Sequence, residues 1–82
     1  MIWRIRLNLR EIIKQTFPNS VVPENIDGLK MGDLAEWDSI GNFNLILAIE
    51  NELNLVFDIR VIEKMNSIQS INEAIEDAAN KK

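Results

Sequence analysis

The sequence predicts an all-α domain, a small four-helix bundle of three main helices and one short helix, with a long loop between the first two. Apolar residues recur at spacings of three and four in separate segments, as in amphipathic helices. Residues typical of helix starts and stops bound these segments. The chain has 82 residues, 46% hydrophobic and 27% charged, without repeats or a break in composition. We therefore expect one domain over residues 1–82.

The first helix is predicted from Ile5 to Phe17. Its apolar residues fall on one face at helical spacing: Ile5, Leu9, Ile12, Ile13 and Phe17. Pro18 ends the helix because proline has no backbone N–H and disfavours a helical residue before it. Residues 18–38 then form the loop, which is long for a small domain.

The second helix is predicted from Ser39 to about Leu53. Asp38 or Ser39 is a suitable N-cap, because a side-chain oxygen at that place accepts a hydrogen bond from a free amide. Asn54 is a plausible stop. One stripe of this helix is expected to face the core, and it consists of Leu45, Ile46, Ile49 and Leu53.

The second helix also has a second apolar stripe. Ile40, Phe43 and Leu47 follow the spacing i, i+3, i+7 on another side. A surface helix of a bundle needs only one stripe, so this one is either buried by a neighbouring helix or exposed for contact. Ile40 lies in the first turn, where burial is hardest to arrange. We therefore favour a contact surface, bordered by Glu50 and other acids.

Two further helices complete the bundle. A short helix is predicted from Ile59 to Met65. Ser70 and Glu73 match a capping box, with Ser70 as the N-cap of a last helix through Ala79. The inward residues of this helix are expected to be Ile71, Ala74, Ile75 and Ala78.

Composition excludes several functions. The chain has no cysteine and no histidine, so it lacks the usual nucleophile–histidine pairs and thiolate metal ligands. No spacing of carboxylates proposes another catalyst or a metal site, and we expect a protein that is not an enzyme. The net charge is −4, and ten of the thirteen acids follow residue 30. Nucleic acid is a poor partner for such a surface.

No apolar run approaches the roughly 20 residues that a transmembrane helix needs. The first residues alternate apolar and basic side chains and lack the apolar core of a secretory signal. We expect a cytoplasmic protein.

Asp38 and Ser39 stand where the long loop meets the second helix. The amides of a helix start are unpaired, and the helix dipole favours negative charge there. A phosphate esterified to Ser39 would be stabilised at that place. The simpler interpretation is that the two residues are an ordinary N-cap.

The chain resembles the acyl carrier proteins, which are small helical bundles with a modified serine. Asp38-Ser39-Ile40 stands for that family's Asp-Ser-Leu, and residues 45–53 are similar to its apolar and then acidic helix. The order of helices and loop agrees as well. The resemblance covers residues 9–75 and is strongest from Leu34 to Leu53.

The resemblance implies that Ser39 carries a 4′-phosphopantetheine arm and that Asp38 caps the helix or assists the transferase. It also implies contacts with partner enzymes in this region, which we expect at Trp37, Ile40, Phe43, Leu47 and Glu50. Gly41 and Asn44 stand where the family commonly has acids, which argues against electrostatic docking on generic enzymes of fatty acid synthesis.

The function implied by the resemblance is that of a monomeric acyl carrier. It would hold an acyl intermediate as a thioester in fatty acid, specialised lipid or polyketide-type biosynthesis. Its partners would be a phosphopantetheinyl transferase and enzymes that activate or transfer acyl groups. Two alternatives stay open: a helical protein-interaction module, and a carrier of aminoacyl cargo.

Overall fold

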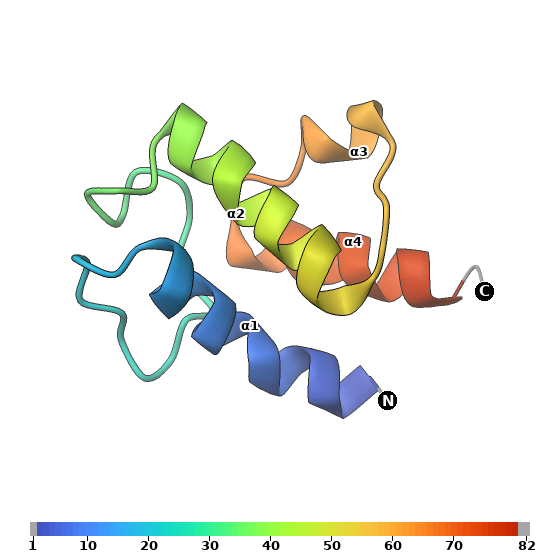
Figure 1. Ribbon diagram of the computed structural model, residues 1–82, viewed down its shortest axis with the longest axis horizontal. Coiled ribbons are helices and arrows are strands. Elements are labelled where there is room, and N and C mark those ends of the chain that lie inside the picture. The colour runs from blue at the N-terminus through green and yellow to red at the C-terminus, as the bar shows by residue number, and fades with distance from the viewer. Residues whose placement is uncertain (1, 81–82) are drawn as a thin grey trace.

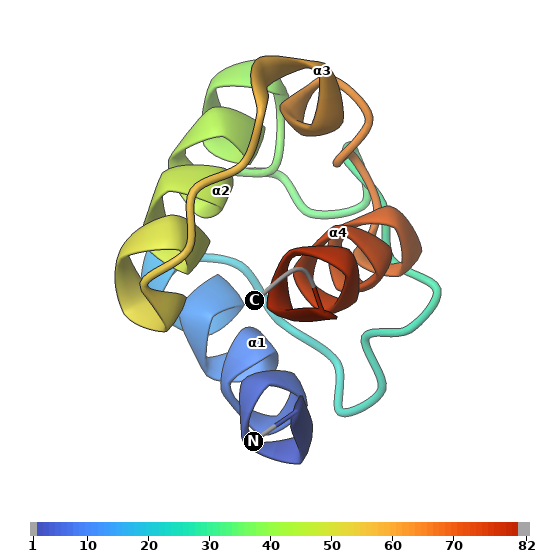
Figure 2. The ribbon, with the colours of Figure 1, turned by 90° about the vertical axis from the view of Figure 1, so that its right-hand side faces the viewer.

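The computed structural model describes residues 2–80, with side chains described from residue 9. Over this range, four helices follow one another in the predicted order. They are α1 (Ile2–Thr16), α2 (Ser39–Leu53), α3 (Ile59–Ile62) and α4 (Ile68–Asn80) (Figure 1). Seen from one end, α1, α2 and α4 surround a common interior, and the short α3 lies beside α2 (Figure 2). The predicted all-α bundle is confirmed.

Helix α1 buries one face against α2 and α4. Leu9, Ile12, Ile13 and Phe17 are all buried, as their spacing predicts. The helix begins three residues before the predicted Ile5, whose side chain lies outside the described residues.

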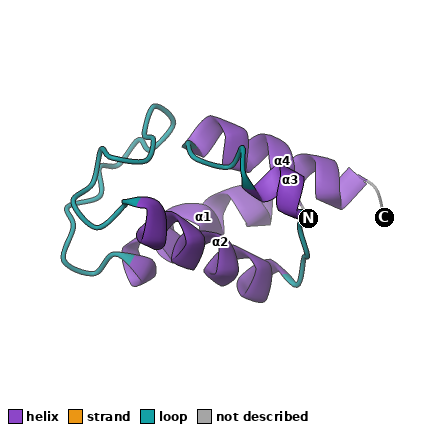
Figure 3. Ribbon diagram, turned by 90° about the horizontal axis from the view of Figure 1, so that it is seen from above, coloured by secondary structure: helices purple, strands orange, loops and turns teal. Residues whose placement is uncertain are grey.

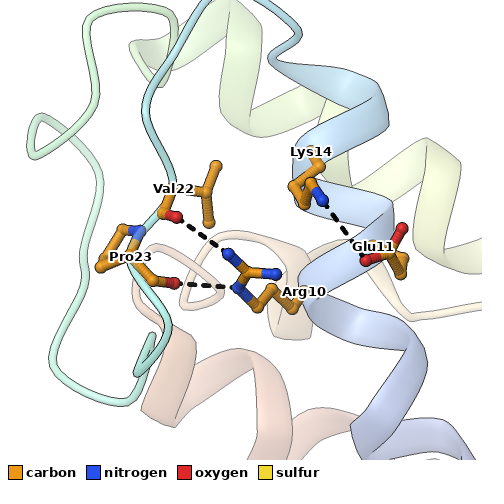
Figure 4. A network of polar contacts seen from close by, with 5 residues as sticks. All are labelled: Arg10, Glu11, Lys14, Val22 and Pro23. Carbon is orange, nitrogen blue, oxygen red and sulfur yellow. Dashed lines mark hydrogen bonds and ion pairs between the residues drawn. The ribbon is translucent and has the colours of Figure 1, made fainter.

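The long loop lies at one end of the helices (Figure 3) and is fastened to α1. The guanidinium of Arg10 donates hydrogen bonds to the carbonyl oxygens of Val22 and Pro23, at 3.0 and 2.9 Å (Figure 4). Farther along, the carboxylate of Glu36 accepts hydrogen bonds from the Ser20 hydroxyl and the Asn19 amide. These bonds draw the loop back onto the bundle.

The loop also pairs with the start of α4. Lys30 and Ser67 form an isolated antiparallel bridge. The Met31 amide donates to the Asn66 carbonyl at 2.8 Å, and the Ile68 amide donates to the Leu29 carbonyl at 2.9 Å. The loop is thereby tied to both α1 and α4.

Helix α2 has the predicted bounds and cap residues. Asn54 ends it in the left-handed conformation, with φ 56°, and its amide donates to the Glu50 carbonyl. Leu45, Ile46 and Ile49 are at most 1% exposed, and Leu53 is partly buried against the core, so the predicted stripe faces the interior.

The structure also corrects one bound each of α3 and α4. Helix α3 ends at Ile62 instead of Met65, because the amides of Lys64 and Met65 bond to carbonyls three residues back, which tightens the chain into a turn. Helix α4 begins at Ile68, so Ser70 lies inside it and is not the N-cap. Ser67 takes that place, and its hydroxyl accepts a hydrogen bond from the Ser70 amide at 3.1 Å.

Candidate functional site

Asp38 is the N-cap of α2, and this leaves Ser39 free. The backbone of Asp38 is extended, and its side-chain oxygen accepts a hydrogen bond from the Gly41 amide at 2.8 Å. Its carbonyl accepts one from the Asn42 amide at 2.7 Å. Ser39 is exposed, and no hydrogen bond joins its hydroxyl to another of the described residues. The hydroxyl is therefore exposed and not engaged in the cap.

The first turn of α2 lies directly against the loop at Gly41. This glycine is buried, and a Cβ atom there would collide with the carbonyl oxygen of Glu36 and come within 3.2 Å of the Phe17 ring. Only glycine allows so close an approach. We did not predict this contact from the sequence, although a glycine in the first turn of a helix is a signal for one.

Trp37 is not a partner contact, which corrects that prediction. Its side chain is fully buried and stacks on Phe17, with ring centroids 6.1 Å apart. The tryptophan occupies the interior because the loop folds under the start of α2, and its indole N–H finds an acceptor there. This Nε1 donates to the Asn42 side-chain oxygen at 2.8 Å.

Asn42 is a residue that sequence reasoning missed. Its amide nitrogen donates to the Met65 carbonyl at 3.0 Å, while its oxygen accepts from Trp37. One side chain therefore joins the loop, α2 and the segment after α3. Helical spacing is a signal that could have found it, because Asn42 lies three and seven residues before Leu45 and Ile49 of the core stripe, whereas Asn44 lies on the other side of the helix.

The second stripe of α2 is exposed. Ile40 is 74% exposed, Phe43 52% and Leu47 46%, which confirms the predicted exposure. We call these three residues the apolar stripe. Beside it, Met31 of the loop and Ile62 of α3 line an open hollow of about 240 Å³, together with Ser39 and Phe43. The sequence did not place Met31 near this site.

Glu50 has a role inside the molecule. It is half-buried, and its carboxylate accepts a hydrogen bond from the Phe57 amide at 2.8 Å. This bond fastens the segment between α2 and α3. A partner contact at Glu50 stays a prediction.

Asp33 has a shifted pKa in the loop before α2. Hydrogen bonds from the Lys30 amide, at 3.0 Å, and from its ammonium group, at 3.2 Å, favour the carboxylate. They lower the pKa of Asp33 below its ordinary value. The charge of Asp33 is therefore paired at neutral pH.

Three further findings concern the described residues and the comparisons. Among the described residues, no cluster of three or more His, Cys, Asp or Glu side chains is placed to bind a metal ion. None of the described helices combines the length and the apolar character needed to cross a bilayer. Comparison with protein-family models, curated proteins and solved structures found no match to this chain.

Proposed function

We propose that this protein is an acyl carrier whose Ser39 holds a 4′-phosphopantetheine arm. The observation that carries the proposal is the exposed, uncommitted hydroxyl of Ser39 at the start of α2. A serine next to a helix start commonly has its oxygen engaged as the cap. Here Asp38 does the capping, so Ser39 is available for modification.

The residues around Ser39 fit a phosphate ester. The cap takes the Gly41 amide, and no hydrogen bond among the described residues uses the amides of Ser39 and Ile40. Free amides and the positive end of the helix dipole stabilise a phosphate group. When attached, the arm supplies a thiol that holds an acyl group as a thioester.

The turn that presents Ser39 is held firmly. Gly41 packs on the Glu36 backbone, and Asn42 joins Trp37 to the Met65 carbonyl. A rigid support keeps a modified residue at a constant place for successive enzymes. The protein's own contribution is thus to position the attachment point, and it performs no chemistry itself.

The apolar stripe is the surface that partner enzymes would contact. It begins one residue after Ser39 and continues along α2, so a protein that reaches the hydroxyl also meets Ile40, Phe43 and Leu47. We propose as partners a phosphopantetheinyl transferase and enzymes that activate or transfer acyl groups, acting in the cytoplasm in fatty acid, specialised lipid or polyketide-type biosynthesis.

Intact mass spectrometry tests the proposal. Incubation with coenzyme A and a broad-specificity phosphopantetheinyl transferase should add one phosphopantetheinyl group to the protein. Ser39→Ala should abolish the addition and keep the helical circular dichroism. Ser20→Ala is the control, because it removes the hydroxyl of another serine, whose oxygen donates to Glu36, and this variant should be modified normally. An unmodified wild type, or a modified Ser39→Ala variant, overturns the proposal.

The exposed stripe also favours a second candidate, a helical module that binds a partner protein without any arm. The same measurement separates the two, since such a module would gain no mass. If the arm is present, mass spectrometry of protein from its own host distinguishes acyl from aminoacyl cargo.

A further inference from the structure

We propose that the connection between α2 and α3 binds an extended segment of a partner protein in which apolar and basic residues alternate. We call residues 55–58 the linker segment. It follows the end of α2, whereas Ser39 lies at the start of that helix (Figure 1). Because α2 has 15 residues, the two places lie roughly 20 Å apart. The inference therefore does not depend on the arm proposed above.

The linker segment has the alternation of a β-strand. Leu55 is 8% exposed, Val56 89% and Phe57 7%. Asp58 continues this order, because its backbone is extended and the residue is exposed. An extended chain directs successive side chains to opposite faces. Residues 55 and 57 thus face the core, and residues 56 and 58 face solvent.

One edge of the linker segment is free of hydrogen bonds. The amides of Leu55 and Phe57 both donate to Glu50, the first to its carbonyl oxygen at 3.0 Å and the second to its carboxylate at 2.8 Å. Successive amides of an extended chain point to opposite edges, so the amide and the carbonyl of Val56 face the other way. No described residue bonds to either group. Val56 therefore offers a donor and an acceptor to an added strand.

A hollow of about 460 Å³ lies between the linker segment and α4. Leu55, Phe57 and Val61 line it on one side, and Ala74 and Ala78 on the other. Side chains of an added strand that face the same way as Leu55 and Phe57 would reach this hollow. Apolar side chains would be removed from water there, which favours binding.

The charge around the linker segment determines the other residues of the partner. The carboxylates of Asp58 and Glu50 accept only from backbone amides, so both keep their negative charge. Among the described residues, no lysine or arginine lines the hollow. Arg60 and Lys64 line a neighbouring hollow that the linker segment does not reach. Basic side chains on the solvent face of an added strand would therefore gain an opposite charge.

These two faces together identify the occupant as a strand with apolar residues on one face and basic residues on the other. A second copy of this chain fits less well. Its linker segment would bring another Asp58, on a molecule with a net charge of −4.

Nuclear magnetic resonance with three peptides of eight residues tests the inference. The first peptide alternates valine and lysine, the second alternates valine and glutamate, and the third is the first with prolines at its two central valines. The valine–lysine peptide should shift the amides of residues 55–58. It should also slow hydrogen exchange of the Val56 amide by up to about tenfold when nine-tenths of the protein is bound, because a paired amide exchanges only when the pair opens.

The other two peptides separate charge from backbone pairing. The valine–glutamate peptide has the wrong charge, and the proline peptide lacks two amides. Each should bind at least about fivefold more weakly than the valine–lysine peptide. The Kd of the valine–lysine peptide should rise several-fold between roughly 0.02 and 0.3 M salt, since opposite charges attract each other at this surface.

Val56→Pro tests the pairing from the side of the protein. Proline removes the Val56 amide, which makes no bond to a described residue, and it favours an extended residue before it. The variant should bind the valine–lysine peptide at least about fivefold more weakly. Val21→Pro is the matched control, because Val21 is also a highly exposed valine whose amide makes no described bond, and it lies in the long loop. Circular dichroism checks that both variants stay helical.

Asp58→Asn tests the charge and keeps an oxygen that accepts from the Arg60 amide. It should weaken the valine–lysine peptide about threefold, because it removes one opposite charge. Glu24→Gln is the matched control, since it removes a carboxylate from the long loop and should leave the Kd unchanged. This pair of variants decides the question even if Val56→Pro does not fold.

Equal binding of the valine–glutamate or the proline peptide overturns the inference, as does the absence of shifts at residues 55–58. Shifts confined to the apolar stripe would place the peptide on α2 and also overturn it. Shifts at Val56 that depend on protein concentration without any peptide would indicate a second copy and reject the proposed partner. Ser39→Ala should bind the peptide as the wild type does. A failed modification test therefore rejects only the carrier, and a failed titration rejects only this inference.

Discussion

The starts of α2 and α4 use serine in opposite ways. At α4, the Ser67 hydroxyl accepts from the Ser70 amide and the Ser70 hydroxyl accepts from the Ser67 amide, both at 3.1 Å. At α2, Asp38 caps the helix and Gly41, three residues later, has no side chain to return the bond. The residue after each cap differs as well, because Ile68 is fully buried whereas Ser39 is exposed.

This difference shows that the type of residue at a helix start does not decide whether its hydroxyl is hydrogen-bonded or left open. A reciprocal pair of serines satisfies both hydroxyls and closes the α4 start. Where an aspartate is the cap and a serine follows, the aspartate accepts the hydrogen bond of the helix amide and the serine hydroxyl is not needed for the cap. The neighbour that caps is what makes Ser39 a candidate for modification.

The largest effect is expected at the third residue of α2. Gly41→Ala should lower the free energy of unfolding by about 2 kcal/mol or more, because the new Cβ collides with the Glu36 backbone and forces it to move. This exceeds the roughly 1 kcal/mol that alanine gains over glycine in a helix. Urea unfolding followed by circular dichroism measures the change.

The control for this variant is Gly28→Ala. Nothing lies within 4 Å of a Cβ at Gly28, so its free energy of unfolding should change by less than about 1 kcal/mol. Equal stability of the two variants would show that the first turn of α2 is not packed as described.

A smaller effect distinguishes the two serines directly. Ser67→Ala should lower the free energy of unfolding by about 1 kcal/mol, because it removes the cap of α4. Ser39→Ala should change the free energy of unfolding by less than about 0.5 kcal/mol, because the Ser39 hydroxyl makes no hydrogen bond to the described residues. The same unfolding experiment measures both, and a larger loss for Ser39→Ala would mean that this serine contributes to the cap.

The smallest effect concerns the pKa of Asp33, which lies in the loop before α2. Its pKa is lowered in the folded state, so its pairing with Lys30 stabilises the fold above the ordinary pKa of aspartate. This contribution is lost as the pH falls through the lowered value. Lys30→Ala should raise the pKa of Asp33 only in part, because the amide of residue 30 still donates.

Carboxyl resonances followed through a pH titration measure the pKa of Asp33. Lys64→Ala is the control, since Lys64 does not act on this carboxylate, and it should leave the titration unchanged. A pKa of Asp33 that is unmoved by Lys30→Ala would contradict the described pairing.

The helices that depend on local signals were predictable. Asp38 and Asn54 bound α2 where the sequence indicates, because caps act over three or four residues. The predicted start of α4 was wrong because Ser70 with Glu73 matches the capping box in the sequence, whereas Ser67 with Ser70 does not match it and still forms the two bonds of the cap. Ile68 is buried in the core, and such a tertiary contact has no local signal.

Only the exposed face of the site was predictable from the sequence. Exposure of Phe43 and Leu47 follows from counting stripes on one helix. The burial of Trp37, the bridging bonds of Asn42 and the packing of Gly41 depend on how the long loop returns to the bundle. The loop brings together residues that are distant in the sequence, whereas helical periodicity describes only residues within one helix.

The bridge between Lys30 and Ser67 has a consequence for motion. It joins the backbone that leads into α2 to the backbone that opens α4. Because these backbone hydrogen bonds hold the two segments together, we expect the loop before α2 and the start of α4 to open as one unit in hydrogen exchange. Helix α4, which lies far from Ser39 in the sequence, would then influence how often the turn at Ser39 opens.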